Sequence, residues 1–143
     1  MRLTVYSDYA LRLLMYAALR PGELVTIQQV ADAYGISRNH LMKVAFELGR
    51  HGFLETVRGR RGGLRLARPA DKIGLGQVVR HTEEDFHMVE CFAVHTDRCA
   101  VTGPCRLKGV LARALKAYLA VLDEYTLADL TRHNAPLARL LSA

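Results

Sequence analysis

The chain has 143 residues, half of them apolar and 24% charged, which is the composition of a folded domain and excludes a disordered segment. Its net charge is +6. Residues 1–68 carry 11 basic and 5 acidic side chains, whereas residues 69–143 carry 9 of each. Because the excess positive charge lies wholly in the first half, we expect that half to bind a polyanion; the alternative is a solvated basic surface.

No stretch reaches the roughly 18 uninterrupted apolar residues that a membrane span requires. Arg12 interrupts the apolar run near the N-terminus, and no small-residue cleavage site follows it. The sequence therefore predicts no membrane contact and a cytoplasmic location, where cysteine thiols stay reduced.

Three helices are predicted in the first 52 residues. The first follows Ser7, its candidate N-cap, and carries one apolar face: Ala10, Leu13, Leu14, Ala17 and Ala18. The second begins at Thr26, which has capping-box spacing to Gln29. The third runs from its cap Ser37 to a glycine stop at Gly52. A short helix, a glycine turn and a second helix are the parts of a helix-turn-helix.

The third predicted helix opens with polar side chains that suit base recognition. Arg38, Asn39 and His40 occupy its first turn, and Lys43 follows one turn later. In a helix-turn-helix, the start of the recognition helix reaches base edges, where Arg pairs with guanine and Asn with adenine. Taken alone, these residues also fit an ordinary exposed helix start.

A β-hairpin is predicted next. Apolar residues alternate through 54–57 and again through 64–67, and the turn between them reads RGRRGG. Its basic side chains are Arg58, Arg60, Arg61 and Arg65. Such a cationic tip can lie on phosphates or in a minor groove. A nucleotide-binding loop is excluded because no GKS/T motif or helix-opening GxGxxG is present.

These elements predict a mainly α protein with a small β-hairpin, built as a winged helix-turn-helix DNA-binding domain over residues 1–70 with its wing at 54–67. The expected partner is double-stranded operator DNA. The candidate DNA-contacting residues are Thr26, Ser37, Arg38, Asn39, His40, Lys43, Arg58, Arg60, Arg61 and Arg65.

The second half, residues 71–143, is predicted to hold a short helix at 75–82, a cysteine loop at 88–105 and helices over 106–143. The long helix after Cys105 carries a seam of four-three spacing: Leu107, Leu111, Ala114, Tyr118, Val121 and Tyr125. A second apolar stripe lies beside it: Val110, Leu115, Leu119 and Leu122. Two stripes exceed what one terminal helix hides, so we expect a homodimer along this helix; the alternative is an intramolecular core.

All three cysteines, Cys91, Cys99 and Cys105, fall within 15 residues. A disulfide would leave one thiol over, and the short knuckles typical of zinc sites are absent. Iron–sulfur clusters accept wider spacings, and Cys105 lies just before a helix N-terminus that favours thiolate. The spacing leaves an iron–sulfur cluster, zinc or redox thiols open, with His87 or His95 as the fourth ligand available within the segment.

An enzyme is not expected. The sequence has no Ser-His-Asp set, HExxH motif or P-loop, and its remaining histidines occur singly, as surface or packing residues: His40, His51, His81 and His133. No acid–base or nucleophilic constellation is therefore available for catalysis.

Several stretches together resemble one family of regulators: LTVYSDYALRLLMYAA, YGISRNHLMKV, VRGRRGGLRLARPA, CRLKGVLARAL and LDEYTLADL. The chain is similar over essentially its whole length to the NsrR-type nitric-oxide-sensing repressors. These form a branch of the iron–sulfur winged-helix regulators, which also include the IscR-type regulators of cluster assembly.

The resemblance implies a homodimeric repressor with one iron–sulfur cluster per subunit, held by Cys91, Cys99 and Cys105. It implies a 4Fe–4S form, with 2Fe–2S as the alternative, and Asp8 of the partner subunit as fourth ligand. Nitric oxide would be the signal that releases DNA. A regulator of the same family that senses iron, cluster supply or oxidants is the alternative.

Two features depart from the family pattern. The gap of seven residues between Cys91 and Cys99 is longer than usual in the family. The assembly branch ligates with a histidine three residues after the third cysteine, where this chain has Lys108. This difference favours the nitric oxide branch and Asp8.

Overall fold

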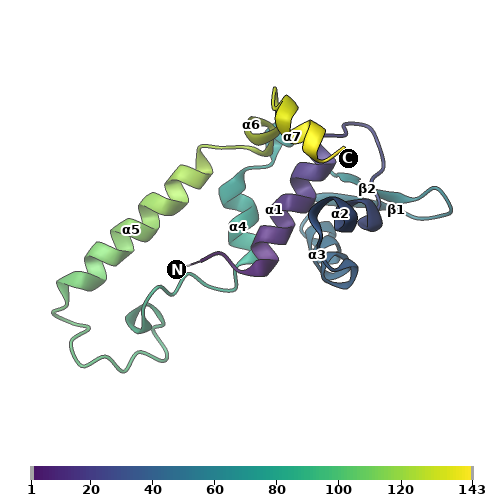
Figure 1. Ribbon diagram of the computed structural model, residues 1–143. Coiled ribbons are helices and arrows are strands. Elements are labelled where there is room, and N and C mark those ends of the chain that lie inside the picture. Colours follow the sequence, from purple (N-terminus) through teal and green to yellow (C-terminus); the bar gives the residue numbers. More distant parts are fainter. Residues whose placement is uncertain (1, 143) are drawn as a thin grey trace.

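The structure is a computed structural model that describes residues 2–142, and it is mainly helical with one two-stranded antiparallel sheet (Figure 1). The elements are α1 (Val5–Ala18), α2 (Ile27–Tyr34), α3 (Arg38–Arg50), β1 (Leu54–Val57), β2 (Gly63–Leu66), α4 (Leu75–Thr82), α5 (Arg106–Asp123), α6 (Leu127–Thr131) and α7 (Ala135–Leu140). Two 3₁₀ turns lie at Ala70–Lys72 and Glu90–Phe92.

Helix α1 is the centre of the core and packs against α3, α4, α6 and β2. Its Leu13 and Leu14 are fully buried, as are Leu41 of α3 and Phe53 before β1. The apolar face predicted for α1 is confirmed except that Ala18 is half-buried. Since burying such side chains stabilises a fold by about 1.5–3 kcal/mol each, this shared core holds the helix-turn-helix, the hairpin and α4 together.

The helix ends follow the predicted signals with one exception. Thr26 and Gln29 form the capping box of α2, and Gly52 takes positive φ after α3. The predicted N-cap of α1 is wrong: the cap is Thr4, whose hydroxyl accepts from the Ser7 backbone N–H at 3.1 Å. Ser7 itself is fully buried, and its hydroxyl bonds to that of Thr82 in α4 at 2.7 Å.

The hairpin pairs Leu54 with Leu66 and Val57 with Gly63. The second strand therefore spans 63–66, one residue earlier than expected. Val25 joins the sheet through two backbone hydrogen bonds with Leu64, of 2.8 and 2.7 Å. These bonds tie the wing to the segment just before α2 of the helix-turn-helix.

Helix α5 stands apart from the core, and none of its residues is fully buried (Figure 1). Its C-terminal end is anchored by backbone hydrogen bonds from Leu75 N–H to Tyr125 C=O at 2.9 Å and from Leu127 N–H to Ile73 C=O at 2.8 Å. In addition, the guanidinium of Arg80 in α4 donates to the carboxylate of Asp123, the last residue of α5, at 2.5 and 2.8 Å. These contacts fix the direction in which α5 projects.

The predicted seam of α5 is divided in the structure. Apolar residues on the inner side are half-buried: Leu111, Leu115, Tyr118, Leu119 and Leu122. Another stripe, the outer stripe, is exposed: Leu107, Val110, Ala114, Ala117 and Val121. Tyr125 lies beyond the end of the helix, because α5 stops at Asp123. Two members of the predicted seam, Leu111 and Tyr118, are thus half-buried in the single chain, and the seam as a dimer contact stays a prediction.

Gly62 allows the hairpin turn to close. A Cβ at this position would overlap the carbonyl oxygen of Val57 and lie 2.9 Å from that of Gly59. Backbone atoms cannot move aside as a side chain can, so we expect Gly62→Ala to destabilise the protein by about 1–3 kcal/mol and to open the wing. Urea unfolding and limited proteolysis of the hairpin would measure both effects.

Gly109→Ala is the matched control, because a Cβ there meets nothing within 4 Å. Alanine also favours a helix over glycine, so this variant should be as stable as the wild type or slightly more stable. Equal stability and equal proteolysis of the two variants would contradict the role given to Gly62.

Candidate nucleic-acid interface and metal centre

The start of α3 presents an exposed polar surface. Ser37 is the N-cap but makes no side-chain capping bond, and Arg38, Asn39 and Lys43 are exposed. The opposite face of α3 is buried against the core, which fixes the direction of these side chains. The arrangement leaves hydrogen-bond donors and acceptors free to meet base edges in a major groove.

Two other predicted DNA contacts have structural partners of their own. Thr26 accepts from the Gln29 backbone N–H at 3.2 Å, and its own N–H donates to the Gln29 side chain at 2.7 Å. His40 is exposed, and its ring lies near that of Tyr9, with centroids 6.2 Å apart. Both residues remain at the surface, but Thr26 serves first as the cap of α2.

The wing carries its arginines at the tip. Arg58, Arg60 and Arg61 are exposed at the turn, where Gly59 takes a φ of 114°. Figure 1 shows the hairpin projecting from the body at the end opposite α5. An extended cationic loop of this kind can reach phosphates beside the groove that α3 would enter.

Arg65 differs from the other wing arginines because it is held by an acidic neighbour. Its guanidinium donates two hydrogen bonds to the carboxylate of Glu55 on β1, at 2.9 and 3.0 Å. These bonds also hold the pKa of Glu55 below its usual value. Sequence reasoning missed Glu55, although the register of the hairpin places it directly opposite Arg65.

The cysteine segment, residues 83–105, joins α4 to α5 and is mostly irregular. Cys91 is buried in its 3₁₀ turn, Cys99 is exposed, and Cys105 is the half-exposed N-cap residue of α5. Asp97 stabilises the turn by accepting from the Cys99 backbone N–H and from the Thr102 hydroxyl, both at 3.0 Å. These bonds lower the pKa of Asp97.

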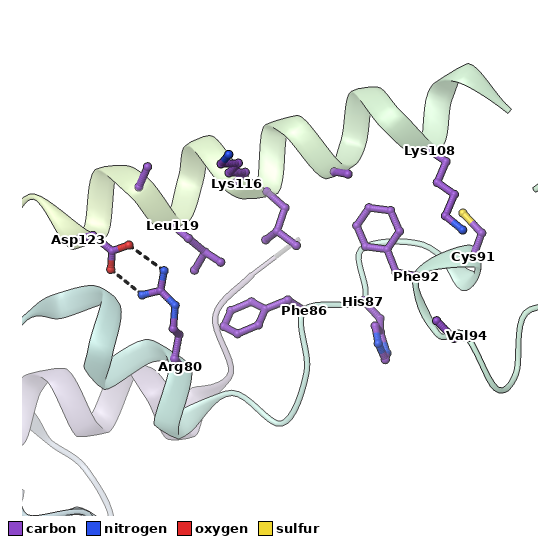
Figure 2. Close-up of a pocket in the computed structure, with 13 residues that line it drawn as sticks. Arg80, Phe86, His87, Cys91, Phe92, Val94, Lys108, Lys116, Leu119 and Asp123 are labelled. Atoms are coloured by element: carbon purple, nitrogen blue, oxygen red, sulfur yellow. Dashed lines mark hydrogen bonds and ion pairs between the residues drawn. The ribbon is translucent and has the colours of Figure 1, made fainter.

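Cys91 lies in the wall of a groove of about 710 Å³ between the cysteine segment and α5 (Figure 2). Phe86 and Phe92 line the groove, and the Lys108 side chain runs toward Cys91. The apolar side chains around Cys91 restrict the access of solvent to its thiol.

The donor chemistry of the segment fits an iron–sulfur cluster. All three thiols are free, thiolates are the usual ligands of such clusters, and Cys105 lies at the N-terminus of α5. Within residues 2–142, no three or more His, Cys, Asp or Glu side chains are gathered closely enough to hold a metal ion. The segment therefore supplies suitable ligands but does not bring them together.

Asp8 lies in the first turn of α1 and is partly exposed. Its carboxylate accepts from Arg12 at 3.0 and 2.8 Å, an i,i+4 ion pair along the helix. Asp8 does not join the cysteines of its own chain. The N-terminus of α1 nevertheless contacts the beginning of the cysteine segment, because Glu83 accepts from the Thr4 backbone N–H at 2.8 Å.

Two of the histidines expected to stand alone are neighbours. The rings of His51, at the end of α3, and His81, in α4, have centroids 4.5 Å apart. Burial lowers the pKa of His81, and the charges of His51 and Arg68 lower it further. The pair is a packing contact between α3 and α4.

The fold and this surface together define a winged-helix DNA-binding protein. The sequence model of the Rrf2 family, described as an iron-dependent transcriptional regulator, matches residues 3–133. The chain belongs to the Rrf2 family. None of the described helices is both long and apolar enough to span a membrane.

Relatives agree with this assignment. The transcriptional regulator NsrR of Bacillus subtilis is 53% identical over 142 residues, which is 99% of this chain and 97% of that protein. NsrR of Halalkalibacterium halodurans is 51% identical over 142 residues, which again is 99% of this chain and 97% of that protein. All are named HTH-type transcriptional regulators, so the chain is a DNA-binding regulator and not an enzyme.

Solved structures show the same fold. The global cysteine regulator CymR of B. subtilis superposes with a TM-score of 0.78 at 22% identity, covering 94% of this chain and 98% of that one. IscR of T. potens has a TM-score of 0.75 at 25% identity, and the match covers 96% of this chain and 90% of that one. The predicted winged-helix fold is thus confirmed.

Releasing Arg65 should tighten DNA binding. Glu55→Gln removes the carboxylate that holds Arg65, so we expect stronger binding to any duplex and a log–log salt slope steeper by up to about 0.9, the value for one added phosphate contact. Fluorescence anisotropy of a labelled duplex across a salt series would measure both. Glu124→Gln, outside the hairpin, makes the same charge change; if it has an equal effect, Arg65 does not contact phosphate.

Proposed function

We propose that the protein is a homodimeric cytoplasmic repressor that binds operator DNA and releases it in response to nitric oxide. Its sensor is an iron–sulfur cluster, a 4Fe–4S cluster in preference to 2Fe–2S, held by Cys91, Cys99, Cys105 and Asp8 of the partner subunit. The observation that carries the proposal is that every thiol of the chain lies in the one segment that joins α4 to α5. The resemblance of the sequence to nitric-oxide-sensing repressors supports nitric oxide as the signal, and the NsrR relatives agree with that resemblance.

When bound, an iron–sulfur cluster supplies iron atoms that combine with nitric oxide. The three thiolates are soft ligands that suit this iron, whereas the Asp8 carboxylate is a hard and weaker ligand. The protein positions the three thiolates and the Asp8 carboxylate and connects them to the DNA-reading surface. Asp8 connects them because it belongs to α1, the helix that packs against the recognition helix α3.

Charge on Asp8 is already balanced within its own chain. Arg12 holds the carboxylate on the surface of α1, so one oxygen or both must leave Arg12 to reach a partner subunit. Arg12 is itself 38% exposed and can turn with little cost. The ion pair thus orients the Asp8 carboxylate on the surface of α1 without burying it.

The outer stripe of α5 supports dimerisation. Leu107 and Val110 are 60% and 58% exposed, and Val121 is 54% exposed. The stripe has heptad spacing, with alanines 114 and 117 at its middle, where a second helix can approach closely. A two-fold dimer along this stripe would also place two recognition helices to read two half-sites.

The role of Asp8 can be tested by comparing two variants that break the same ion pair. Asp8→Ala removes the carboxylate, so we expect iron retention to fall by about tenfold or more and nitric oxide to lose its effect on DNA binding. Arg12→Gln removes only the ion-pair partner and should keep both properties. Iron analysis and DNA-binding anisotropy under anaerobic conditions would measure them.

If Asp8→Ala still bound the operator tightly and still released it with nitric oxide, the assigned role of Asp8 would be wrong. If both variants lost iron equally, the ion pair itself would be the important feature.

The dimer can be tested on α5. Ala114→Glu places a carboxylate in the middle of the outer stripe, and we expect the protein to become monomeric at micromolar concentration because burying an unpaired charge is costly. Ala112→Glu makes the same change on the opposite side of the helix and should leave the dimer intact. Light scattering after gel filtration would measure the mass of each variant. A monomeric Ala112→Glu variant beside a dimeric Ala114→Glu variant would place the interface on the other face of α5.

A further inference from the structure

The recognition helix carries two large apolar side chains that its own core does not use. Met42 is 51% exposed and Phe46 is 66% exposed, although the neighbouring residues Leu41, Val44 and Leu48 are almost fully buried. Met42 and Phe46 are four residues apart, so they lie on the same side of α3, one turn after the other. An exposed apolar pair on a helix face is a sign of a binding surface.

The surroundings of this pair are cationic and polar. Asn39, Lys43 and Arg50 are exposed on the same solvent-facing side of α3. The helix has one acidic residue, Glu47, and that carboxylate is bound by Arg50 at 3.1 Å. A partner for this face must therefore be negatively charged and must also offer apolar groups between its polar ones.

The major groove of DNA has this combination. Its phosphates are negative, its base edges offer donors and acceptors, and the thymine C5-methyl is its one apolar group. An acidic protein surface would also offer negative charge. The pair, however, lies on the same helix as the base-reading start of α3 and in the same domain as the arginines of the wing, and both of these are assigned to DNA. The charge and position of the pair thus favour DNA.

We propose that Met42 and Phe46 contact thymine methyl groups and so set part of the operator sequence. The inference rests on the proposed function, because it requires that α3 enters the major groove. With a rise of 1.5 Å per residue, Met42 lies about 4.5 Å and Phe46 about 10 Å along the helix from Asn39. At 3.4 Å per base, and because a recognition helix lies at an angle to the DNA axis, these offsets correspond to at most about one and three base-pair steps. Each half-site therefore contains thymines at these two offsets from the base that Asn39 reads.

The test uses full-length protein and DNA that lacks only the methyl groups. Duplexes are selected from a random library by the wild-type protein under anaerobic conditions, and each thymine of the selected site is then replaced by deoxyuridine. We expect about a fourfold loss of affinity for each contacted methyl, the equivalent of one buried methyl group. Two positions per half-site should show this loss, and the other thymines should show none.

Phe46→Ala should bind the thymine duplex about as weakly as the wild type binds the duplex with deoxyuridine at the Phe46 position. It should no longer distinguish the two duplexes. Because Phe46 is exposed, the variant is expected to fold, and circular dichroism checks this directly. Phe46→Leu keeps an apolar side chain and should recover part of the discrimination.

Two controls separate methyl contact from other effects. Leu140→Ala removes another exposed apolar side chain, 75% exposed and far along the chain in α7, and should bind as the wild type does. A double Arg60→Ala, Arg61→Ala variant should weaken binding to thymine and deoxyuridine duplexes equally, with a flatter salt slope.

The outcomes distinguish the inference from the function on which it rests. Binding to selected duplexes with no loss on deoxyuridine substitution, or with the same loss in the wild type and in Phe46→Ala, overturns methyl recognition and leaves the proposed function intact. Failure to enrich any duplex overturns DNA binding through α3, and the inference with it.

Discussion

The buried hydroxyl of Ser7 is the contact on which the arrangement of the two halves depends. It bonds to the hydroxyl of Thr82 at 2.7 Å and to the carboxylate of Glu83, which also accepts from the Thr4 backbone and side chain. The start of α1 is thereby joined to the end of α4, where the cysteine segment begins. Breaking this network would leave buried polar groups unpaired, at a cost of about 1–3 kcal/mol each.

Under the proposed function, this constraint makes α1 the route between sensing and DNA reading. One end of α1 is bonded to the cysteine segment, and its length packs against α3, whose exposed face is the proposed DNA-reading surface. Asp8 immediately follows Ser7, so a cluster of the partner subunit that binds Asp8 would also pull on the turn of α1 that Ser7 anchors. A signal changes DNA affinity only if it favours one arrangement over another, and α1 is the element that both surfaces share.

The sequence predicts those features that depend on local chemistry. Periodicity located Leu13, Leu14 and Ala17 on the buried face of α1, and the Thr26–Gln29 spacing located the start of α2. Features that depend on distant contacts were missed or misassigned. Ser7 was the predicted cap of α1, but its hydroxyl is buried against Thr82 of the distant α4, and the cap is Thr4. Likewise, the stripes of α5 are visible in the sequence, but the side that faces the chain itself depends on where α4 lies.

The proposed control of DNA binding by one iron–sulfur cluster can be tested by an anaerobic titration with nitric oxide. The absorption of the iron-loaded protein and the anisotropy of labelled operator DNA would be followed in the same sample, after iron and sulfide have been counted. We predict that cluster absorption bleaches and DNA is released over the same range of nitric oxide equivalents. Bleaching without release, or release from protein that holds no iron, would contradict the claim.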